Sequence, residues 1–354
     1  MALKKLPALL MKRTAIADAA NKAVLSNGTV STIINNIKNS VGSKIRNHIL
    51  EVMKELSSCS KGIVRNSNNG SQDKSIGIII KDLKYPFYTS IAYGAREYAN
   101  RKGYSLIITC TDNSYESEKN FSYLFSKYDI RGTIMAPIVE GTAEIEHLFK
   151  LKRINYPFVL LEAVKGIQAN VVAIDNIKAI KKAVKYLINS GHKRIVHFAG
   201  PPKSFRTEER IWGFRHAFSE STLVFHHNMI EYVGYNYDES FSKTINYFRN
   251  KNRDDYPTAI VCFNDQQALA VMKALKELYI HVPNDISIVG NDDIDYARIS
   301  PVPLTTIRAP LHEIGRKAAE ILIRNIESPT QLPTEHVILE TEFIIRESTK
   351  VLNN

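Results

Sequence analysis

The chain has 354 residues and 44% of them are hydrophobic, so it is long enough for two or three globular domains with ordinary cores. No apolar run approaches the roughly 20 residues that span a membrane, which argues against a membrane protein. The formal net charge is +11 at pH 7. Residues 1–75 hold twelve Lys/Arg and four Asp/Glu, so most of the positive excess lies in this fifth of the chain.

This concentration of positive charge is typical of a nucleic-acid-binding module, although a solvated basic face has the same composition. The three cysteines, Cys59, Cys110 and Cys262, are far apart and lack metal-ligand spacing, which favours a reducing cytoplasm over a disulfide framework. The apolar stretch 6–11 is shorter than the core of a typical secretory signal and is interrupted by Lys12 and Arg13. We therefore expect a cytoplasmic protein.

Three short helices are expected within residues 14–57, because apolar residues recur at helical spacing around 16–23, 30–37 and 45–56. Two helices joined by a short turn can place the second helix in the major groove of DNA. A small helical cap with ordinary Ser and Thr at its helix ends is the alternative. The polar residues near or on the second helix that could bond phosphates or base edges are Ser26, Asn27, Thr29, Ser31 and Asn35.

Residues 58–74 are rich in Ser, Asn and Gly, which predicts a linker. From Ser75 onward, apolar runs typical of strands alternate with helical patterns, and this predicts an α/β fold with parallel sheets. The expected strands are 76–80, 105–109, 132–136, 158–161, 194–198, 229–233, 259–262 and 286–289. The expected helices include 88–101, 177–189, 208–219, 266–278 and 311–326. Two runs of strands predict two lobes, with a break near Asp175-Asn176.

Two of these strands end in polar side chains, at Phe263-Asn264-Asp265 and at Gly290-Asn291-Asp292-Asp293. Parallel α/β sheets bind ligands at the carboxyl ends of their strands, so a cleft for a small polar molecule is expected there. Aromatic faces pack on a sugar or base, and Arg, Asn and Asp bond its hydroxyls or heteroatoms. We expect Asp265 to cap the following helix. The candidate cleft residues are Phe87, Tyr88, Asp112, Arg206, Arg210, Asn236, Asn264 and Asp292.

Signals for catalysis are weak. No Gly-x-Gly-x-x-Gly follows the first strand, and the histidines lack the context of a metal site or a nucleophile. Asp292 and Asp293 could act as acid and base, but adjacent residues on a loop normally point apart. We therefore expect no enzyme, no cofactor and no metal site.

Taken together, the motifs resemble the lactose-repressor (LacI/GalR) family of bacterial transcription regulators, over nearly the whole chain from about Thr14. Residues 18–31 with Asn35 are similar to the family's D-V-A-x-x-A-G-V-S-x-x-T-V-S…N signature. Further matching motifs in the body are Gly191-His192, Phe263-Asn264-Asp265, Val282-Pro283-Asn284-Asp285-Ile286-Ser287, Gly290-Asn291-Asp292-Asp293 and Pro303-Leu304-Thr305-Thr306-Ile307.

The resemblance implies a helix-turn-helix head (14–57), a hinge (58–74) and a two-lobed effector domain like periplasmic sugar-binding proteins. The N-terminal lobe would comprise 75–175 and 300–330, and the C-terminal lobe 176–299 and 331–350. It also implies a homodimer on a double-stranded DNA operator, controlled by a sugar, sugar phosphate or nucleoside-like effector. Arg210 and Asp292 match the most typical effector-contact residues. The implied DNA-binding residues are Ser26, Asn27, Gly28, Thr29, Ser31, Thr32 and Asn35, of which Asn27, Gly28 and Thr32 occupy base-reading sites.

Several positions depart from the family pattern. Val24 stands where the family has Gly in the turn, and Gly28 weakens the recognition helix by roughly 0.5–1 kcal/mol relative to Ala. The hinge lacks the family's Pro, and Ser67 replaces an apolar Leu that would wedge into the minor groove. Asn291 stands where an aromatic residue is usual. These departures leave open an alternative, a ligand-binding sensor whose head no longer binds DNA strongly.

Overall fold

The computed structural model describes residues 74–138 and 145–352. The chain divides into two compact units, Met1–Gln72 and Asp73–Asn354. The predicted head and nearly all of the predicted hinge therefore lie outside the described residues, as do the seven predicted DNA-binding residues. In the part of the chain that the structure describes, no helix is long and apolar enough to cross a membrane.

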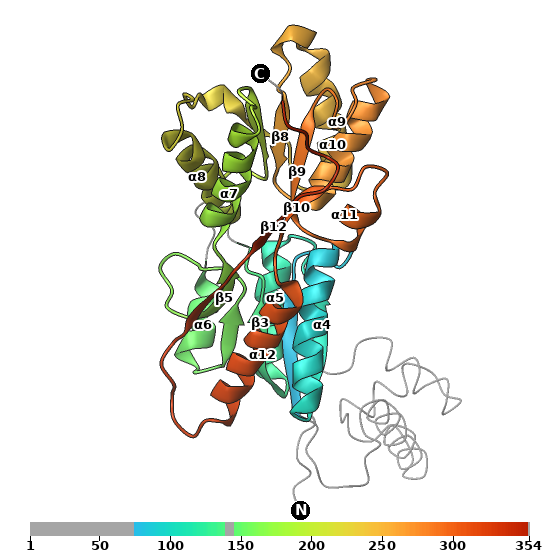
Figure 1. Ribbon diagram of the computed structural model, residues 1–354. Coiled ribbons are helices and arrows are strands. Elements are labelled where there is room, and N and C mark those ends of the chain that lie inside the picture. Colours follow the sequence, from blue (N-terminus) through green and yellow to red (C-terminus); the bar gives the residue numbers. More distant parts are fainter. Residues whose placement is uncertain (1–73, 139–144, 353–354) are drawn as a thin grey trace, which may run out of the picture. The chain divides into compact units, whose positions relative to one another are not determined.

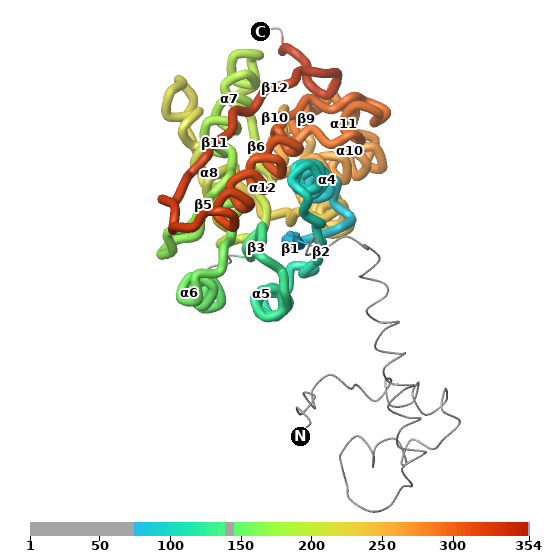
Figure 2. Tube along the Cα trace, turned by 90° about the horizontal axis from the view of Figure 1, so that it is seen from below, coloured from blue at the N-terminus to red at the C-terminus, as the bar shows by residue number. Residues whose placement is uncertain are grey.

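The first lobe is built on a six-stranded parallel sheet with the strand order β11-β5-β4-β3-β1-β2. Its strands are β1 (Lys74–Ile80), β2 (Tyr104–Cys110), β3 (Ile130–Met135), β4 (Phe158–Leu160), β5 (Asn170–Ile174) and β11 (His336–Leu339). Helices α4 (Pro86–Arg101) and α12 (Leu311–Glu327) cover one face, and α5 (Tyr115–Lys127) and α6 (Glu146–Arg153) cover the other (Figure 2). The Ile-rich sequence of β1 suits this position, because a strand covered on both faces buries successive side chains.

The second lobe has its own six-stranded sheet, with the order β12-β10-β9-β8-β6-β7 and with only β12 antiparallel to its neighbour (Figure 1). Its strands are β6 (Ile195–Ala199), β7 (Ile230–Tyr232), β8 (Ala259–Cys262), β9 (Ser287–Asp292), β10 (Thr305–Arg308) and β12 (Glu342–Ile344). Helices α7 (Asn176–Asn189) and α8 (Phe205–Ser219) pack on one face, and α9 (Tyr237–Arg249) and α10 (Asp265–Glu277) on the other. The short helices α11 (Asp295–Ile299), η1 (His227–Met229) and η2 (Arg253–Asp255) lie in connections.

The eight strands and five helices named from the sequence are all present, with ends that differ by up to three residues. The predicted α/β fold with two lobes and largely parallel sheets is confirmed. Four short strands, β5, β10, β11 and β12, were not among the predicted elements. In β10 the reason is chemical: Thr305 and Thr306 have polar side chains, but both are fully buried because tertiary hydrogen bonds satisfy their hydroxyls.

The chain passes between the lobes later than the expected boundaries at 300 and 331, after β10 and again after β11. Strand β10 lies in the second sheet, whereas β11 lies in the first, the reverse of the expected assignment. Between them α12 packs against α4 of the first lobe. This contact is close because both helices carry glycine there: a Cβ on Gly94 would lie 2.0 Å from the His312 carbonyl oxygen, and one on Gly315 would lie 1.8 Å from that of Ile91.

Candidate functional site

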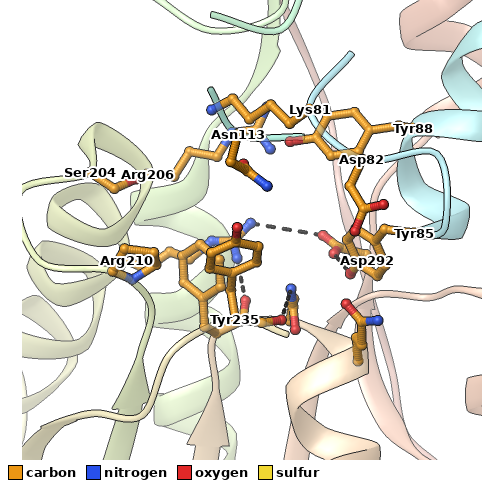
Figure 3. A pocket seen from close by; sticks show the side chains of 14 residues that line it. Lys81, Asp82, Tyr85, Tyr88, Asn113, Ser204, Arg206, Arg210, Tyr235 and Asp292 are labelled. Atoms are coloured by element: carbon orange, nitrogen blue, oxygen red, sulfur yellow. Dashed lines mark hydrogen bonds and ion pairs between the residues drawn. The ribbon is translucent and has the colours of Figure 1, made fainter. Parts of the chain in front are cut away.

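A cavity of about 60 Å³ lies between the two lobes, where the carboxyl ends of strands from both sheets meet. The residues that line it come from the loops and helices that follow β1 and β2 in the first lobe and β6 to β8 in the second, and from the end of β9 (Figure 3). They are Lys81, Asp82, Tyr85, Tyr88, Asn113, Pro201, Ser204, Arg206, Arg210, Tyr235, Phe263, Asn264, Gln266 and Asp292.

Arg210 is a buried cation of this cavity with several protein partners. It lies on α8 and is buried, and its Nε donates a hydrogen bond to Asn176 Oδ1 at 3.1 Å. Its Nη1 donates to the backbone carbonyl of Phe263, and the guanidinium lies 4.3 Å from the centroid of that ring. Its Nη2 lies 3.8 Å from Asp292 Oδ1, across the cavity in Figure 3. The positive charge is thus positioned by the protein's own groups.

The backbone around Asp292 is strained, and the buried Asp265 carboxylate stabilises it. Asp292 and Asp293 both have positive φ, at 123° and 58°, a region that non-glycine residues adopt at a cost of about 1–3 kcal/mol each. Asp265 holds this turn: its Oδ2 accepts from the Ile294 N–H at 2.9 Å, and its Oδ1 accepts from the Thr306 hydroxyl at 2.6 Å. Gly290 leaves room for that carboxylate, since a Cβ there would lie 2.2 Å from Asp265 Oδ1.

Asp292 and Asp293 are directed to different partners. Asp292 lines the cavity, whereas Asp293 pairs with Arg308 Nε at 2.7 Å and with Arg346 Nη2 at 2.7 Å. The two adjacent carboxylates therefore do not face a common reacting atom. Among the described residues there is also no cluster of three or more His, Cys, Asp or Glu side chains that could hold a metal ion.

Burial dominates the electrostatics of the second-lobe wall. It raises the pKa of Asp292 to about 6, although the charge of Arg210 acts in the opposite direction. It raises the pKa of Asp265 to about 7, and the negative charge of Asp292 adds to this shift. The two carboxyls thus titrate near neutral pH rather than near 4.

The first-lobe wall contains an ion-paired cluster that reaches across to the second lobe. Glu162, after β4, forms two ion pairs. One oxygen lies 2.8 Å from Lys81 Nζ, and the other lies 2.9 Å from Nε of Arg206 on α8. Burial alone would raise the pKa of Glu162, but the charges of Arg206 and Lys81 outweigh it and hold that pKa below its ordinary value. Arg206 also lies over the Phe87 ring, 5.1 Å from its centroid.

The structure brings five of the eight predicted cleft residues to the cavity: Tyr88, Arg206, Arg210, Asn264 and Asp292. Phe87 lies beneath Arg206 and borders an adjoining cavity of about 90 Å³, which Arg206 and Arg210 also border.

Asp112 and Asn236 lie outside the lining. Asp112 is exposed and accepts the thiol hydrogen of Cys110 at 3.2 Å, while its neighbour Asn113 reaches the cavity. Asn236 caps α9 by accepting the Glu239 N–H at 3.0 Å, while its neighbour Tyr235 lines the cavity.

The prediction that Asp265 caps α10 is wrong. Asn264 is the cap, and its Oδ1 accepts from the Gln267 N–H at 2.7 Å. Asp265 is instead the buried group that holds the Asp292 turn.

Sequence reasoning missed several residues of the site, although most of them follow a strand by only a few positions. That proximity to a carboxyl end is the signal that could have found them. They are Lys81, Asp82, Tyr85, Asn113, Glu162, Ser204, Tyr235, Phe263 and Gln266.

Comparisons with known proteins agree with this architecture. Residues 184–349 match the family described as "Periplasmic binding protein-like domain". The chain is 27% identical over 340 residues to the HTH-type transcriptional repressor PurR of Vibrio vulnificus (strain CMCP6), a match that covers 96% of this chain and 99% of that protein.

Two solved structures share the fold. The complex of the transcriptional regulator CelR with cellobiose has a TM-score of 0.70 at 24% identity, covering 94% of this chain and 99% of that one. The lac repressor dimer bound to operator and the anti-inducer ONPF has a TM-score of 0.69 at 22% identity, covering 94% and 98%. The sequence motifs of head and body, the family match and the similarity to PurR over 96% of this chain support the LacI/GalR family of bacterial transcription regulators, and the two solved structures show the shared two-lobed fold.

Proposed function

We propose that this protein is a DNA-binding transcription regulator, acting as a repressor, whose operator affinity is set by a small carbohydrate-like effector bound between the two lobes. The observation that carries the proposal is the convergence of Arg210, Asn264 and Asp292 on one interlobe cavity. The similarity to a transcriptional repressor over 99% of that protein's length supports the regulatory role, because the match spans both units of this chain.

The chemistry of the cavity suits a polyhydroxylated effector. A carboxylate such as Asp292 accepts hydroxyl hydrogens, whereas the Arg210 guanidinium donates, and aromatic rings such as Tyr88 pack on the apolar face of a sugar. The cellobiose in the CelR structure supports a sugar over the other two effector classes, a sugar phosphate or a nucleoside-like molecule. We propose Tyr88, Arg206, Arg210, Asn264 and Asp292 as its contacts.

Effector binding requires movement of the two lobes or of cavity side chains. Small-molecule pockets have volumes of roughly 300–1,000 Å³, several times the cavity of about 60 Å³ found here. An effector can shift a conformational equilibrium only by binding one arrangement more tightly than the other. Opening of the lobes is therefore the step through which effector occupancy would reach the DNA-binding head.

The DNA partner is a double-stranded operator, read by residues 14–57 with the seven head residues named from the sequence. The partner protein is a second copy of the chain, as in the lac repressor dimer. Exposed apolar side chains on α4 and on the edge strand β2 support a protein contact at that edge of the first lobe: Tyr93, Ile107 and Ile108 are each at least 39% exposed. We place the protein in the cytoplasm and assign it no catalytic role.

Selection from a pool of random duplex DNA tests the proposal and requires no assumption about the operator sequence. The expected result is enrichment of a near-palindromic sequence, with binding that weakens as salt rises and that changes on addition of one member of a panel of sugars, sugar phosphates and nucleosides. A thermal-shift screen of the same panel measures effector binding directly, because a ligand that binds only the folded state raises its stability. Absence of any enriched sequence, together with absence of any thermal shift, would contradict the proposal.

A ligand-binding sensor without strong DNA affinity is the second candidate, favoured by Val24 in the turn and Ser67 in the hinge. Both are sequence departures at positions where the family pattern serves DNA binding. A thermal shift with a sugar, combined with no enrichment from the duplex pool at low salt, would support this candidate instead.

A further inference from the structure

Both carboxylate oxygens of Asp292 have protein partners. Its Oδ1 accepts from Asn291 Nδ2 at 2.9 Å and faces Arg210 Nη2. Its Oδ2 accepts the hydroxyl hydrogen of Tyr85. Tyr85 precedes α4 in the first lobe, whereas Asp292 ends β9 in the second, so this bond joins the two walls of the cavity (Figure 3).

The Tyr85 side chain is held in place by the groups around it. The ring is 94% buried, stacks on Phe87 with centroids 5.9 Å apart and meets the edge of Tyr88 at 6.3 Å. Pro86 at the first turn of α4 fixes the backbone that follows. Burial, together with the charge of Asp292, raises the pKa of the phenol, so the hydroxyl keeps its proton at neutral pH and acts as the donor.

We propose that Tyr85 determines effector affinity by competing for Asp292: its hydroxyl occupies the hydrogen-bonding position that an effector hydroxyl would take. This inference rests on the function proposed above. A polyhydroxylated effector then binds by exchanging one hydroxyl donor for another on the same carboxylate. An effector without a hydroxyl at that position cannot make the exchange, so Tyr85 also selects among related sugars.

The energetic consequence follows from the free state. Removing the Tyr85 hydroxyl leaves Asp292 buried with one donor fewer, which destabilises the effector-free arrangement but not the complex, where the effector supplies the donor. The net contribution of one ordinary hydrogen bond corresponds to a rise in effector affinity of about 3- to 10-fold.

The test uses the full-length chain and the substitution Tyr85→Phe, which keeps the ring. The dissociation constants of cellobiose, D-ribose, D-glucose 6-phosphate and adenosine are measured by calorimetry near neutral pH. The probe that binds the wild type should bind Tyr85→Phe about 3- to 10-fold more tightly. Tyr128→Phe, which removes an exposed hydroxyl at the end of α5 in the same lobe, should match the wild type. Equal or weaker binding by Tyr85→Phe would overturn the proposal, as would tightening that persists when Asp292→Asn is added.

A second measurement needs no effector. Amide hydrogen exchange in segments 85–92 and 291–297 should become faster in Tyr85→Phe and in Asp292→Asn, and the double variant should be no faster than the faster single one. Exchange in Tyr85→Phe at the wild-type rate, or additive effects of the two changes, would show that the interlobe bond does not act. If no probe binds any variant, the function proposed above fails, and hydrogen exchange still decides the role of Tyr85.

Discussion

The two walls of the cavity are built on different physical principles. On the second-lobe wall, Arg210, Asn264 and Asp292 are buried polar groups that already have protein partners. On the first-lobe wall, the rings of Tyr85 and Tyr88 line the cavity beside the Lys81–Glu162 ion pair. Preorganised charges select by geometry, whereas aromatic faces contribute area with little directional demand. Effector selectivity should therefore reside mainly in the second-lobe polar groups and in Tyr85, which competes for one of them.

The same contrast predicts how damaging substitutions are on each wall. Removing a fixed charge leaves its buried partner uncompensated, which is costly in a low-dielectric site. Trimming an aromatic ring mainly loses apolar contact.

The largest effect is expected for Arg210→Ala. The substitution leaves Asp292 buried without its nearest cation, and breaking a buried pair from one side costs about 3–5 kcal/mol. Effector binding should weaken by at least about 100-fold, so the thermal shift with the effector disappears. Arg215→Ala on the same helix is the control, because Arg215 contacts Trp212 and Phe225 rather than the cavity. An undiminished thermal shift in Arg210→Ala would remove Arg210 from the site.

The second effect concerns the pH dependence of stability, and it tests whether Asp265 supports the second-lobe wall. Burial raises the pKa of Asp265 from 3.8 to about 7, so the folded protein binds a proton there that the unfolded chain has released. The free energy of unfolding should therefore fall as pH rises from about 4 to about 7. His197 acts in the opposite direction, because burial lowers its pKa to about 4 and its contribution to stability grows as pH rises to about 6.5.

Asp265→Asn separates these two contributions. The amide cannot titrate, yet its oxygen can accept the Ile294 N–H and its nitrogen can donate to the Thr306 hydroxyl oxygen, so the turn keeps both contacts. Between pH 4 and pH 7 the free energy of unfolding of the variant should no longer show this decline, a change on the order of 2 kcal/mol that is shared with Asp292, whose titration is coupled to that of Asp265. Urea unfolding across this range measures it. Parallel pH profiles for variant and wild type would show that Asp265 does not titrate there.

The sequence was a good guide to the sheets because their strands are apolar runs that local pattern reveals. Strand β1 is an example, since Ile76, Ile78, Ile79 and Ile80 are all fully buried. Strand β10 was not predicted, because Thr305 and Thr306 become suitable for a core only through hydrogen bonds to Arg346 and Asp265, which are distant in sequence.

The site was predicted to the correct strand ends but not always to the correct residue. After β2, Asp112 and Asn113 both adopt positive φ. The turn that they form determines which of the two side chains reaches the cavity. The sequence pattern does not encode that choice. The pairing of Glu162 with Arg206 joins two lobes, so it depends on a tertiary arrangement that local spacing cannot supply.

A smaller effect is expected on the first-lobe wall. Tyr88→Ala should weaken effector binding by about 10-fold through lost apolar contact, whereas Tyr88→Phe, which retains the ring, should weaken it by no more than about 3-fold. Titration calorimetry with the best-binding sugar gives both values. If Tyr88→Phe were as damaging as Tyr88→Ala, the hydroxyl rather than the ring would be the important group, and the contrast between the walls would be weaker than the structure suggests.

The smallest effect separates two asparagines that share a local role. Asn236 caps α9 and Asn264 caps α10. Each side-chain oxygen accepts the backbone N–H of the residue three positions later, at 3.0 Å and 2.7 Å. Serine caps a helix about as well as asparagine, so Asn236→Ser and Asn264→Ser should each change stability by only a few tenths of a kcal/mol.

Their effects on effector binding should differ, because only Asn264 lines the cavity, where its Nδ2 also donates to the Tyr235 carbonyl at 3.2 Å. Asn264→Ser removes that amide and should weaken effector binding by about 3-fold, a loss comparable to one ordinary hydrogen bond, while Asn236→Ser should leave it unchanged. Equal affinities for the two variants would mean that Asn264 serves α10 alone. A difference would show that one strand-end asparagine serves both the fold and the ligand because its helix begins at the cavity.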